Sequence, residues 1–248
     1  MYKNVLIISD NQYLSKEFHE ITKEFSFENT SFSYSISPFS NIEKFNFIEV
    51  AKISIFNLKV DKDIDYIINN YDLVISLHCK QLFPSKLIKS IKCINVHPGY
   101  NPINRGWYPQ VFAILHNLPV GATIHEIDEL LDHGPIIARE FVEKTSYDTS
   151  SSLYNKILQK ELSLIRKNLK NIVNKTYQIQ SPELEGNLYL KKDFNRLLEL
   201  NMDEELSTKA LIDKLRALTH ENYDNAYFID KATGKKIFVR IILNPSEN

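Results

Sequence analysis

Glycine is scarce in this sequence, with six among 248 residues, and the first of them is Gly99. The first apolar run, residues 5–9, is therefore not followed by the glycine-rich turn that brings a pyrophosphate to the start of a helix. This absence excludes the usual NAD-binding fingerprint. Four of the six glycines lie between Cys93 and Gly134, with the only tryptophan and four of the seven histidines. Because glycine serves sharp turns and close approach to ligands, we expect the chemistry in this window.

Cysteine, excess charge and long apolar runs are also missing. Cys79 and Cys93 are too few for a disulfide framework and form no Cys-x-x-Cys metal motif. The formal net charge of −1 does not indicate a surface for nucleic acid. No apolar run approaches the roughly 18 residues of a membrane span, and the first residues do not resemble a signal peptide. We expect a soluble cytoplasmic protein that binds no nucleic acid, membrane or metal.

Apolar runs alternate with helical patterns over the first part of the chain. Short runs that predict strands occupy residues 5–9, 32–36, 53–56, 73–77, 91–96 and 136–142. Apolar positions at helical spacing occupy residues 13–25, 62–70, 85–89 and 150–174. Thr149 is the expected N-cap of the longest helix. The alternation predicts an α/β fold with a Rossmann-like, mostly parallel sheet flanked by helices.

The composition changes at the polar stretch 176–187, which is typical of a boundary. Beyond it we expect one helix at residues 207–218 and a β-hairpin within residues 226–239. The sequence therefore predicts a catalytic domain at residues 1–180 and a small C-terminal extension, helix plus β-hairpin, at residues 181–248.

Three side chains with complementary chemistry fall near one expected strand end. Asn95 and His97 share a face of that strand at its carboxyl end, where open α/β sheets bind ligands. Asp132 precedes a His-Gly-Pro turn far along the chain, so only folding can bring it to the other two. Each residue alone has a structural explanation, as a turn former or a hydrogen-bonded histidine. Together, an amide, an imidazole and a carboxylate are suited to acyl transfer to an amine.

Several separated motifs then agree in order and spacing. They are Asn-Val-His-Pro-Gly at 95–99, Arg-Gly at 105–106, Gly-Ala-Thr-Ile-His at 121–125, and Asp128, Asp132, Gly134, Pro135 and Ile136. These motifs resemble the formyltransferase family that uses 10-formyltetrahydrofolate, over roughly the first 180 residues. The resemblance implies that an amine attacks the formyl carbon directly. It also implies that Asn95 and His97 stabilise the oxyanion, while Asp132 positions His97 and helps to move protons.

The resemblance further implies a site for 10-formyltetrahydrofolate as a co-substrate rather than a prosthetic group. Two loops would line the pterin pocket, and the backbone of the second would recognise the pterin edge. Their residues are Cys79, Lys80, Gln81, Leu82, Phe83 and Pro84 in the first loop, and Ile127, Asp128, Glu129, Leu130 and Leu131 in the second. His78, His116 and His125 we interpret as structural.

The segments at 99–102 and 105–109 are most similar to the branch of the family that acts on nucleotide-linked amino sugars. Residues 99–104 replace the Ser-Leu-Leu-Pro motif of the methionyl-tRNA branch. The sequence does not decide whether this replacement changes the loop geometry, for instance through a cis peptide bond at Asn101-Pro102. The implied acceptor is the 4-amino group of dTDP-4-amino-4,6-dideoxyglucose or a close isomer, for bacterial surface polysaccharide such as O-antigen in lipopolysaccharide. The alternatives are a UDP-amino sugar, a dTDP-3-amino sugar, methionyl-tRNA, or a folate- or nucleotide-sugar-binding module without catalysis.

Aromatic and cationic residues near the motifs are candidates for contacts to the sugar nucleotide. They are Arg105, Gly106, Trp107, Tyr108, Lys192, Phe194 and Tyr223. A solvated charged turn beside one core phenylalanine explains residues 191–196 equally well.

The expected hairpin carries exposed aromatic and apolar residues that suit a homodimer interface. They are Tyr227, Phe228, Ile237 and Phe238. The alternative is that the hairpin only covers its own core.

Overall fold

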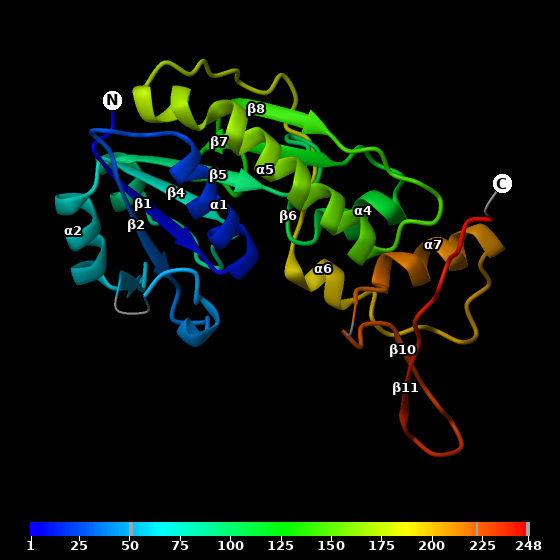
Figure 1. The fold of residues 1–248 in the computed structure, drawn as a ribbon. Helices are drawn as coiled ribbons and strands as arrows, with labels where there is room; N and C mark the ends of the chain where they lie inside the picture. The colour runs from blue at the N-terminus through cyan, green and yellow to red at the C-terminus, as the bar shows by residue number, and fades with distance from the viewer. Residues whose placement is uncertain (50–51, 222, 247–248) are drawn as a thin grey trace.

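A seven-stranded sheet forms the centre of the computed structural model, which describes residues 1–49, 52–221 and 223–246 (Figure 1). Its strands lie in the order β3-β2-β1-β4-β5-β7-β8. Their bounds are β1 (Asn4–Ser9), β2 (Ser31–Ile36), β3 (Ile53–Ile55), β4 (Leu73–Leu77), β5 (Lys92–His97), β7 (Gly121–Glu126) and β8 (Ile136–Phe141). The first five pair in parallel, whereas β7 and β8 are antiparallel. The predicted α/β, mostly parallel sheet is confirmed.

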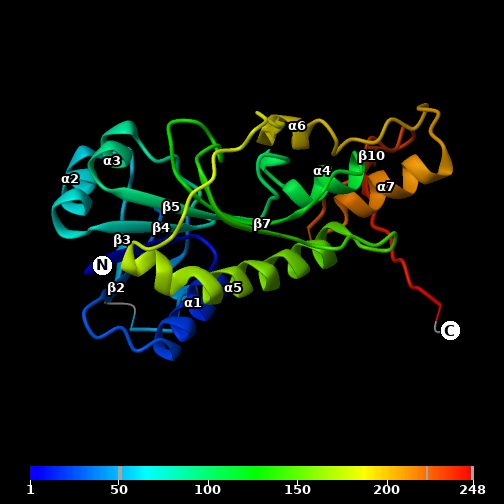
Figure 2. The same cartoon turned by 90° about the horizontal axis from the view of Figure 1, so that it is seen from above.

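Helices cover both faces of the sheet, with α1 and α5 on one side and α2 and α3 on the other (Figure 2). Their bounds are α1 (Gln12–Glu24), α2 (Asp61–Asn70), α3 (Ser85–Ser90) and α5 (Ser150–Asn174). Val5 and Ile7 pack toward α1 and α5, and Leu6 and Ile8 pack toward α2 and α3. Burial on both faces explains why the parallel strands are continuous apolar runs.

The motif at 121–125 forms strand β7, which the apolar pattern does not predict. Strand β7 is antiparallel to β5, and its register places His125 opposite Asn95. The loop between these strands holds β6 (Arg105–Gly106) and α4 (Pro109–Leu115), which also lack a predictive pattern. The antiparallel return keeps this whole loop beside the carboxyl end of β5.

The residues after α5 return to the sheet before they enter the C-terminal part. Gln180 pairs with Ile136, and β9 (Leu188–Tyr189) runs parallel to β6. The remaining elements are η1 (Ile42–Lys44) in the first half, and α6 (Lys191–Asn195), α7 (Thr208–Leu218), β10 (Tyr227–Ile229) and β11 (Lys236–Phe238) in the last part. The predicted helix and antiparallel hairpin are confirmed.

The C-terminal part shares an apolar core with α4 and the start of α5. Phe194, Leu218 and Ala226 pack there with Phe112 and Leu153. The hairpin itself projects away from the body of the molecule (Figure 1). In the described part of the chain, no helix is both long and apolar enough to cross a membrane.

Candidate active site

Asn95, His97 and Asp132 meet at the carboxyl edge of the sheet. Asn95 and His97 end strand β5, and Asp132 lies in the loop between β7 and β8 with a positive φ of 48°. The Asn95 Nδ2 donates to Asp132 Oδ1 at 3.0 Å, and His97 Nδ1 lies 3.5 Å from Asp132 Oδ2. The structure thus brings together the three side chains singled out from the sequence.

Two further groups contact this trio, namely the main chain of Gly106, predicted from the sequence as a sugar-nucleotide contact, and the side chain of His125, interpreted there as structural. The Gly106 N–H donates to Asp132 Oδ2 at 3.1 Å. The His125 Nε2 lies 3.3 Å from Asn95 Nδ2 and 3.6 Å from Asp132 Oδ1. Its Nδ1 lies 2.8 Å from the Glu126 carbonyl oxygen, which can only accept, so we assign the proton to Nδ1 and let Nε2 accept from Asn95. The contact of His125 with Asn95 follows from the pairing of β7 with β5, which the sequence pattern did not predict.

The trio pairs an ionised carboxylate with a neutral imidazole. Burial of the Asp132 carboxyl opposes its ionisation, but causes led by the charge interaction with His97, and including the Gly106 N–H, lower its pKa to about 2. Burial lowers the pKa of His97, although the Asp132 carboxylate opposes that shift. At neutral pH, His97 is therefore a neutral ring beside a carboxylate that favours its protonation as negative charge develops nearby.

The chain packs tightly around His97. A Cβ atom on Gly99 would lie 2.4 Å from His97 Nε2 and 2.9 Å from the Asn104 carbonyl oxygen. That oxygen is also 3.4 Å from His97 Nε2, and because it and the Asp132 carboxylate can only accept, the neutral imidazole donates to one of the two at a time. Glycine at this position is therefore a packing requirement of the imidazole.

The turn after β5 also fixes the loop that carries Asp132. The Asn101–Pro102 peptide bond is cis. Thr123 Oγ1 donates to the Gly99 carbonyl oxygen at 2.7 Å and accepts from the Asn101 N–H at 3.1 Å. The Asn101 side-chain amide donates to the Asp132 carbonyl oxygen at 2.9 Å. One turn therefore connects strand β5, strand β7 and the loop that carries Asp132.

The two predicted folate loops lie on the same face of the sheet. Cys79, Phe83 and Ile127 pack against the apolar cluster beneath α2 and α3, and burial raises the pKa of the Cys79 thiol to about 12. Within the same loops, Leu82 and Leu130 are exposed, at 76% and 56%. The loops thus combine buried anchors with apolar side chains that are free to contact a ligand.

Other residues of these loops are held by local contacts. The Gln81 side chain donates to the Phe56 carbonyl oxygen and accepts from the Leu58 N–H. The Lys80 N–H donates to Asp10 at 2.6 Å, and Pro84 precedes α3. In the second loop, Glu129 pairs with Lys89 at 2.7 Å, Asp128 lies 2.6 Å from His133, and Leu131 is half-buried. A cavity of about 390 Å³ lies beside Asp128 and His133, lined also by Pro135 and residues 181–185.

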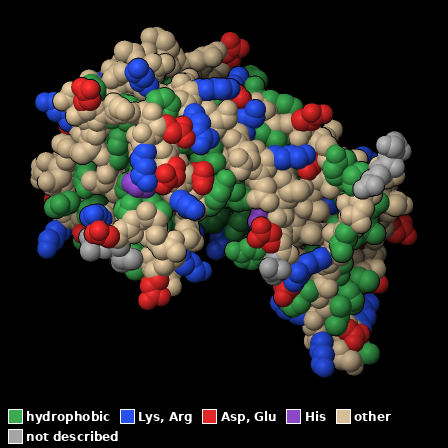
Figure 3. All heavy atoms as spheres, in the orientation of Figure 1, with side chains coloured by type: hydrophobic (Ala, Val, Ile, Leu, Met, Phe, Trp, Pro, Cys, Tyr) green, Lys and Arg blue, Asp and Glu red, His purple; other side chains and the backbone are tan. Residues whose placement is uncertain are grey.

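The predicted sugar-nucleotide residues fall into a buried and an exposed group. Arg105 is buried, with its guanidinium 2.7 Å from Glu185, and Phe194 is buried with its ring centroid 4.2 Å from that of Tyr108. Trp107 is partly exposed, with Lys191 Nζ 5.5 Å from its ring centroid. Lys192 and Tyr223 are exposed. The molecular surface is hollowed between the part that holds the sheet and the C-terminal part (Figure 3).

Metal ligation has no obvious place in this arrangement. Within the ranges that the structure describes, no three or more His, Cys, Asp and Glu side chains are grouped so that they could hold an ion. The chemistry that the site can supply is hydrogen bonding and proton transfer by the amide, imidazole and carboxylate.

Comparison with known proteins follows the same division of the chain. Residues 38–169 match the family described as formyl transferase, and residues 193–245 match the N-formyltransferase dimerization C-terminal domain. The chain is 49% identical over 181 residues to dTDP-4-amino-4,6-dideoxyglucose formyltransferase of Mycobacterium tuberculosis, covering 73% of this chain and 77% of that protein.

Solved structures resemble almost the whole chain. A 4-N formyltransferase from Francisella tularensis superimposes with a TM-score of 0.92 at 39% identity, covering 98% of this chain and 99% of that one. A sugar N-formyltransferase from a Shewanella species gives a TM-score of 0.91 at 36% identity, with the same coverage of 98% and 99%.

Proposed function

The chain belongs to the formyltransferase family, and from this premise we propose that it transfers a formyl group from 10-formyltetrahydrofolate to the 4-amino group of dTDP-4-amino-4,6-dideoxyglucose. The product would serve the synthesis of bacterial surface polysaccharide such as O-antigen. The observation that carries the proposal is the 49% identity to an enzyme of that name, in a chain whose Asn95, His97 and Asp132 converge at one sheet edge.

The proposed mechanism is direct attack of the amine on the formyl carbon. His97 and Asn95 would stabilise the oxyanion, and Asp132 would hold His97 and take part in proton transfer. The support is geometric, since the Asp132 carboxylate lies 3.0 Å from Asn95 Nδ2 and 3.5 Å from His97 Nδ1. The Asn95 amide N–H groups contact Asp132 and His125, so binding the oxyanion requires one of them to change partner.

We propose that the folate occupies the two loops after β4 and β7. Exposed Leu82 and Leu130 provide apolar contact, and the anchoring of Cys79 and Ile127 on one core cluster holds the loops together. For the sugar nucleotide, exposed Trp107, Lys192 and Tyr223 are the candidates for direct contact. Arg105, Gly106, Tyr108 and Phe194 would shape that site from beneath, because Arg105 and Phe194 are buried and the Gly106 N–H is bonded to Asp132.

A homodimer through the hairpin is part of the proposal. Of the four residues predicted for this interface, Ile237 and Phe238 are exposed on the projecting hairpin, as is Ile229, whereas Tyr227 and Phe228 are half-buried. Residues 193–245 match a family of dimerization domains. Isolated two-stranded hairpins are marginally stable, so packing against a second copy supplies the missing support. We further propose a cytoplasmic location, because Cys79 and Cys93 are both free thiols.

A substrate panel tests the function. The enzyme is incubated with 10-formyltetrahydrofolate and dTDP- and UDP-linked 3-amino and 4-amino sugars, and each product is examined by mass spectrometry for the gain of one CO. We expect the fastest formylation with dTDP-4-amino-4,6-dideoxyglucose. Preference for a UDP sugar or a 3-amino sugar would change the acceptor. Reaction only with methionyl-tRNA, or with no amine at all, would overturn the proposal.

A further inference from the structure

A second histidine lies beside the catalytic one at the sheet edge. In the parallel pairing of β4 and β5, Leu77 is the partner of Val96, so the next residues along the two strands are His78 and His97. Adjacent strands are about 4.8 Å apart, which makes these two histidines neighbours. His78 leaves its strand with a φ of 55°, a left-handed conformation that turns its side chain away from the regular pleat.

His78 is the centre of a chain of hydrogen bonds. Its Nε2 lies 2.8 Å from Glu161 Oε1, and its Nδ1 lies 3.0 Å from the Tyr154 hydroxyl. The Asn11 side-chain amide donates to that hydroxyl at 3.3 Å. Because the carboxylate can only accept, we assign the imidazole proton to Nε2, and Nδ1 then accepts from Tyr154. The ring is thus a proton acceptor on one side and is backed by a carboxylate on the other.

The burial of the Glu161 carboxylate costs free energy that its packing contacts do not explain. Its side chain is fully buried, and its Oε2 has no hydrogen-bond partner among the residues that the structure describes. A buried carboxylate with an unsatisfied oxygen is destabilising, and its presence in the folded protein points to a function. The Glu161 charge also acts on the catalytic ring, since it opposes the lowering of the pKa of His97 that burial causes.

Glu161 and Tyr154, both on α5, contact His78, and further charged and titratable groups lie on four neighbouring elements, β1, β4, β5 and the end of α7. Asp10 follows β1, His97 ends β5, and Glu161 and Tyr154 project from α5. Lys80 follows β4, and the His220 ring lies 5.6 Å from that of Tyr154. Burial raises the pKa of Tyr154, and the Glu161 charge adds to that shift. Two imidazole–carboxylate pairs therefore stand at one edge, His97 with Asp132 and His78 with Glu161.

Formyl transfer to an amine releases more protons than the His97–Asp132 pair alone would take up. An aliphatic amine arrives largely as an ammonium ion and loses one proton before it attacks. The new C–N bond forms as the carbonyl electron pair moves to oxygen, and the nitrogen then loses a second proton. The bond from the formyl carbon to folate N10 breaks as N10 takes up one proton. One proton is therefore left over in each turnover.

We propose that Tyr154, His78 and Glu161 form a relay that accepts this surplus proton from the acceptor amine. The inference rests on the proposed function. The Tyr154 oxygen takes the proton while its own passes to His78 Nδ1, and the resulting imidazolium is held by Glu161 until it loses the proton to water. The His97–Asp132 pair remains free for the transfer to N10. Residues of this chain supply the intermediate acceptors, water is the final one, and no further reactant is required.

Three variants test the relay with dTDP-4-amino-4,6-dideoxyglucose and 10-formyltetrahydrofolate. Glu161→Gln removes the charge but keeps an acceptor for His78, Tyr154→Phe removes one hydroxyl, and His78→Asn keeps a residue that tolerates the left-handed backbone. We expect kcat to fall by roughly tenfold or more in each variant, with KM for the folate unchanged. In Glu161→Gln we also expect the pH profile of kcat to differ from that of the wild type, because the relay has lost its carboxylate.

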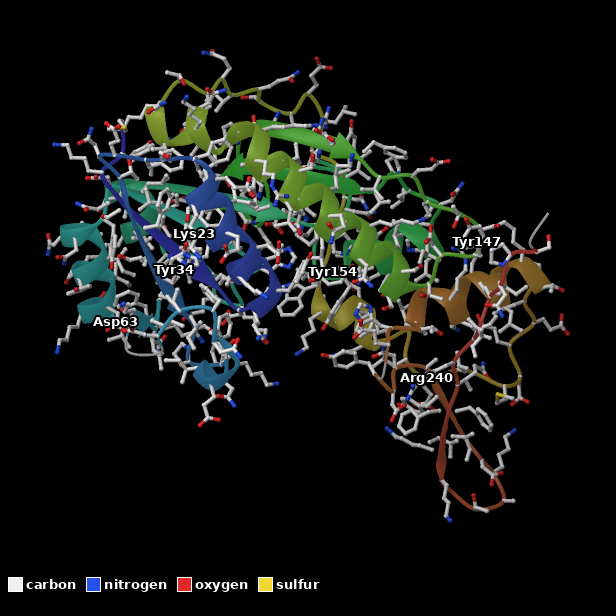
Figure 4. All side chains as sticks on the ribbon, in the orientation of Figure 1. Lys23, Tyr34, Asp63, Tyr147, Tyr154 and Arg240 are labelled. Carbon is white, nitrogen blue, oxygen red and sulfur yellow. The ribbon has the colours of Figure 1, made fainter. Side chains whose placement is uncertain are left out.

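The matched control is Tyr34→Phe. The Tyr34 hydroxyl lies 3.1 Å from His19 Nδ1 in an equivalent tyrosine–histidine pair, but in the N-terminal half and away from Tyr154 (Figure 4). This variant should lose stability and keep the wild-type kcat profile. Wild-type kcat and pH dependence in Tyr154→Phe and Glu161→Gln, with only a lower Tm, would overturn the relay and leave the proposed function intact. A wild-type enzyme that formylates no amino sugar would overturn both.

Discussion

Gly99 is the glycine whose missing side chain leaves room for the His97 imidazole, the proposed catalytic group. Because an added Cβ would lie 2.4 Å from His97 Nε2, Gly99→Ala must displace the ring or the turn that holds it. A displacement near 1 Å typically costs about 100-fold in rate, so we predict a fall of that order in kcat. Steady-state formylation kinetics measure it.

Gly234 provides the comparison for that substitution. It has a positive φ of 68°, but no atom lies within 4 Å of an added Cβ. Gly234→Ala should cost roughly 1 kcal/mol of stability through backbone strain and leave kcat unchanged. Equal kcat values for Gly99→Ala and the wild type would show that the imidazole is not packed as described.

The Asp132 carboxylate links the site to acid stability. Its pKa falls from 3.8 to about 2 in the folded state, so it contributes stability that is present above pH 4 and is lost as the pH falls through about 2. The contribution is about 2 kcal/mol. Burial also lowers the pKa of His97, so protonation of this ring below its ordinary pKa of 6.5 favours the unfolded state. His97 therefore also makes the protein less stable as the pH falls.

Urea unfolding of the wild type and Asp132→Asn from pH 2 to pH 7 measures this linkage. We predict that the difference in unfolding free energy between the two proteins shrinks by about 2 kcal/mol from neutral to the lowest pH. A difference that does not change with pH would mean that Asp132 is not preferentially ionised in the folded protein.

At the residue scale, the sequence was informative where chemistry is carried by side-chain identity. Asn95, His97 and Asp132 could be named in advance because amide, imidazole and carboxylate stand beside glycine turns. His125 could not be assigned, because its contact with Asn95 depends on a register between strands. The Gly106 N–H could not either, since every non-proline residue has a main-chain donor and only folding aims this one at Asp132.

At the element scale, the long and periodic segments were predictable and the short ones were not. Helix α5 was predicted at its observed bounds because apolar residues recur along all of it. Strands β6 and β9 have two residues each, which is too short for any period, and their pairing is between distant parts of the chain. The site depends on both kinds, since α5 supplies Tyr154 and Glu161 and β6 supplies the Gly106 N–H.

The N-cap of α5 gives a prediction at the scale of a single helix. The Thr149 side chain accepts from the Ser152 N–H at 3.3 Å, and Ser152 Oγ accepts from the Thr149 N–H at 3.0 Å. We predict that Thr149→Ala lowers the free energy of unfolding by about 1 kcal/mol and leaves kcat near the wild-type value. Urea denaturation and the formylation assay measure the two effects. A large loss of kcat would mean that the start of α5 takes part in the site.

At the scale of the whole molecule, the C-terminal part has two roles. It closes an apolar core with α4 and α5, and it presents the hairpin outward. The boundary expected near residue 180 remains a prediction. The shared core makes the packing of the two parts mutually dependent. We do not expect residues 1–180 alone to keep the wild-type stability.

The hairpin gives a prediction about assembly. Phe238→Asp places a charge on an exposed aromatic position of β11 and should convert a dimer into a monomer, because burying an unpaired charge at an interface is unfavourable. Light scattering coupled to size exclusion measures the mass. Val60→Asp, an exposed position that precedes α2 on another part of the molecule, should leave the dimer intact. A wild-type protein that is monomeric at micromolar concentration would contradict the proposed interface.

The rate of formylation of dTDP-4-amino-4,6-dideoxyglucose by the wild type and by His97→Asn, measured in the same assay with folate affinity determined in parallel, tests the central claim most directly. We predict that the wild type adds one CO to the sugar. We also predict that His97→Asn slows turnover by about 100-fold or more while folate binds nearly as before. Full activity in His97→Asn, or no product with the wild type, would contradict the assignment of this sheet edge as a formyl-transfer site.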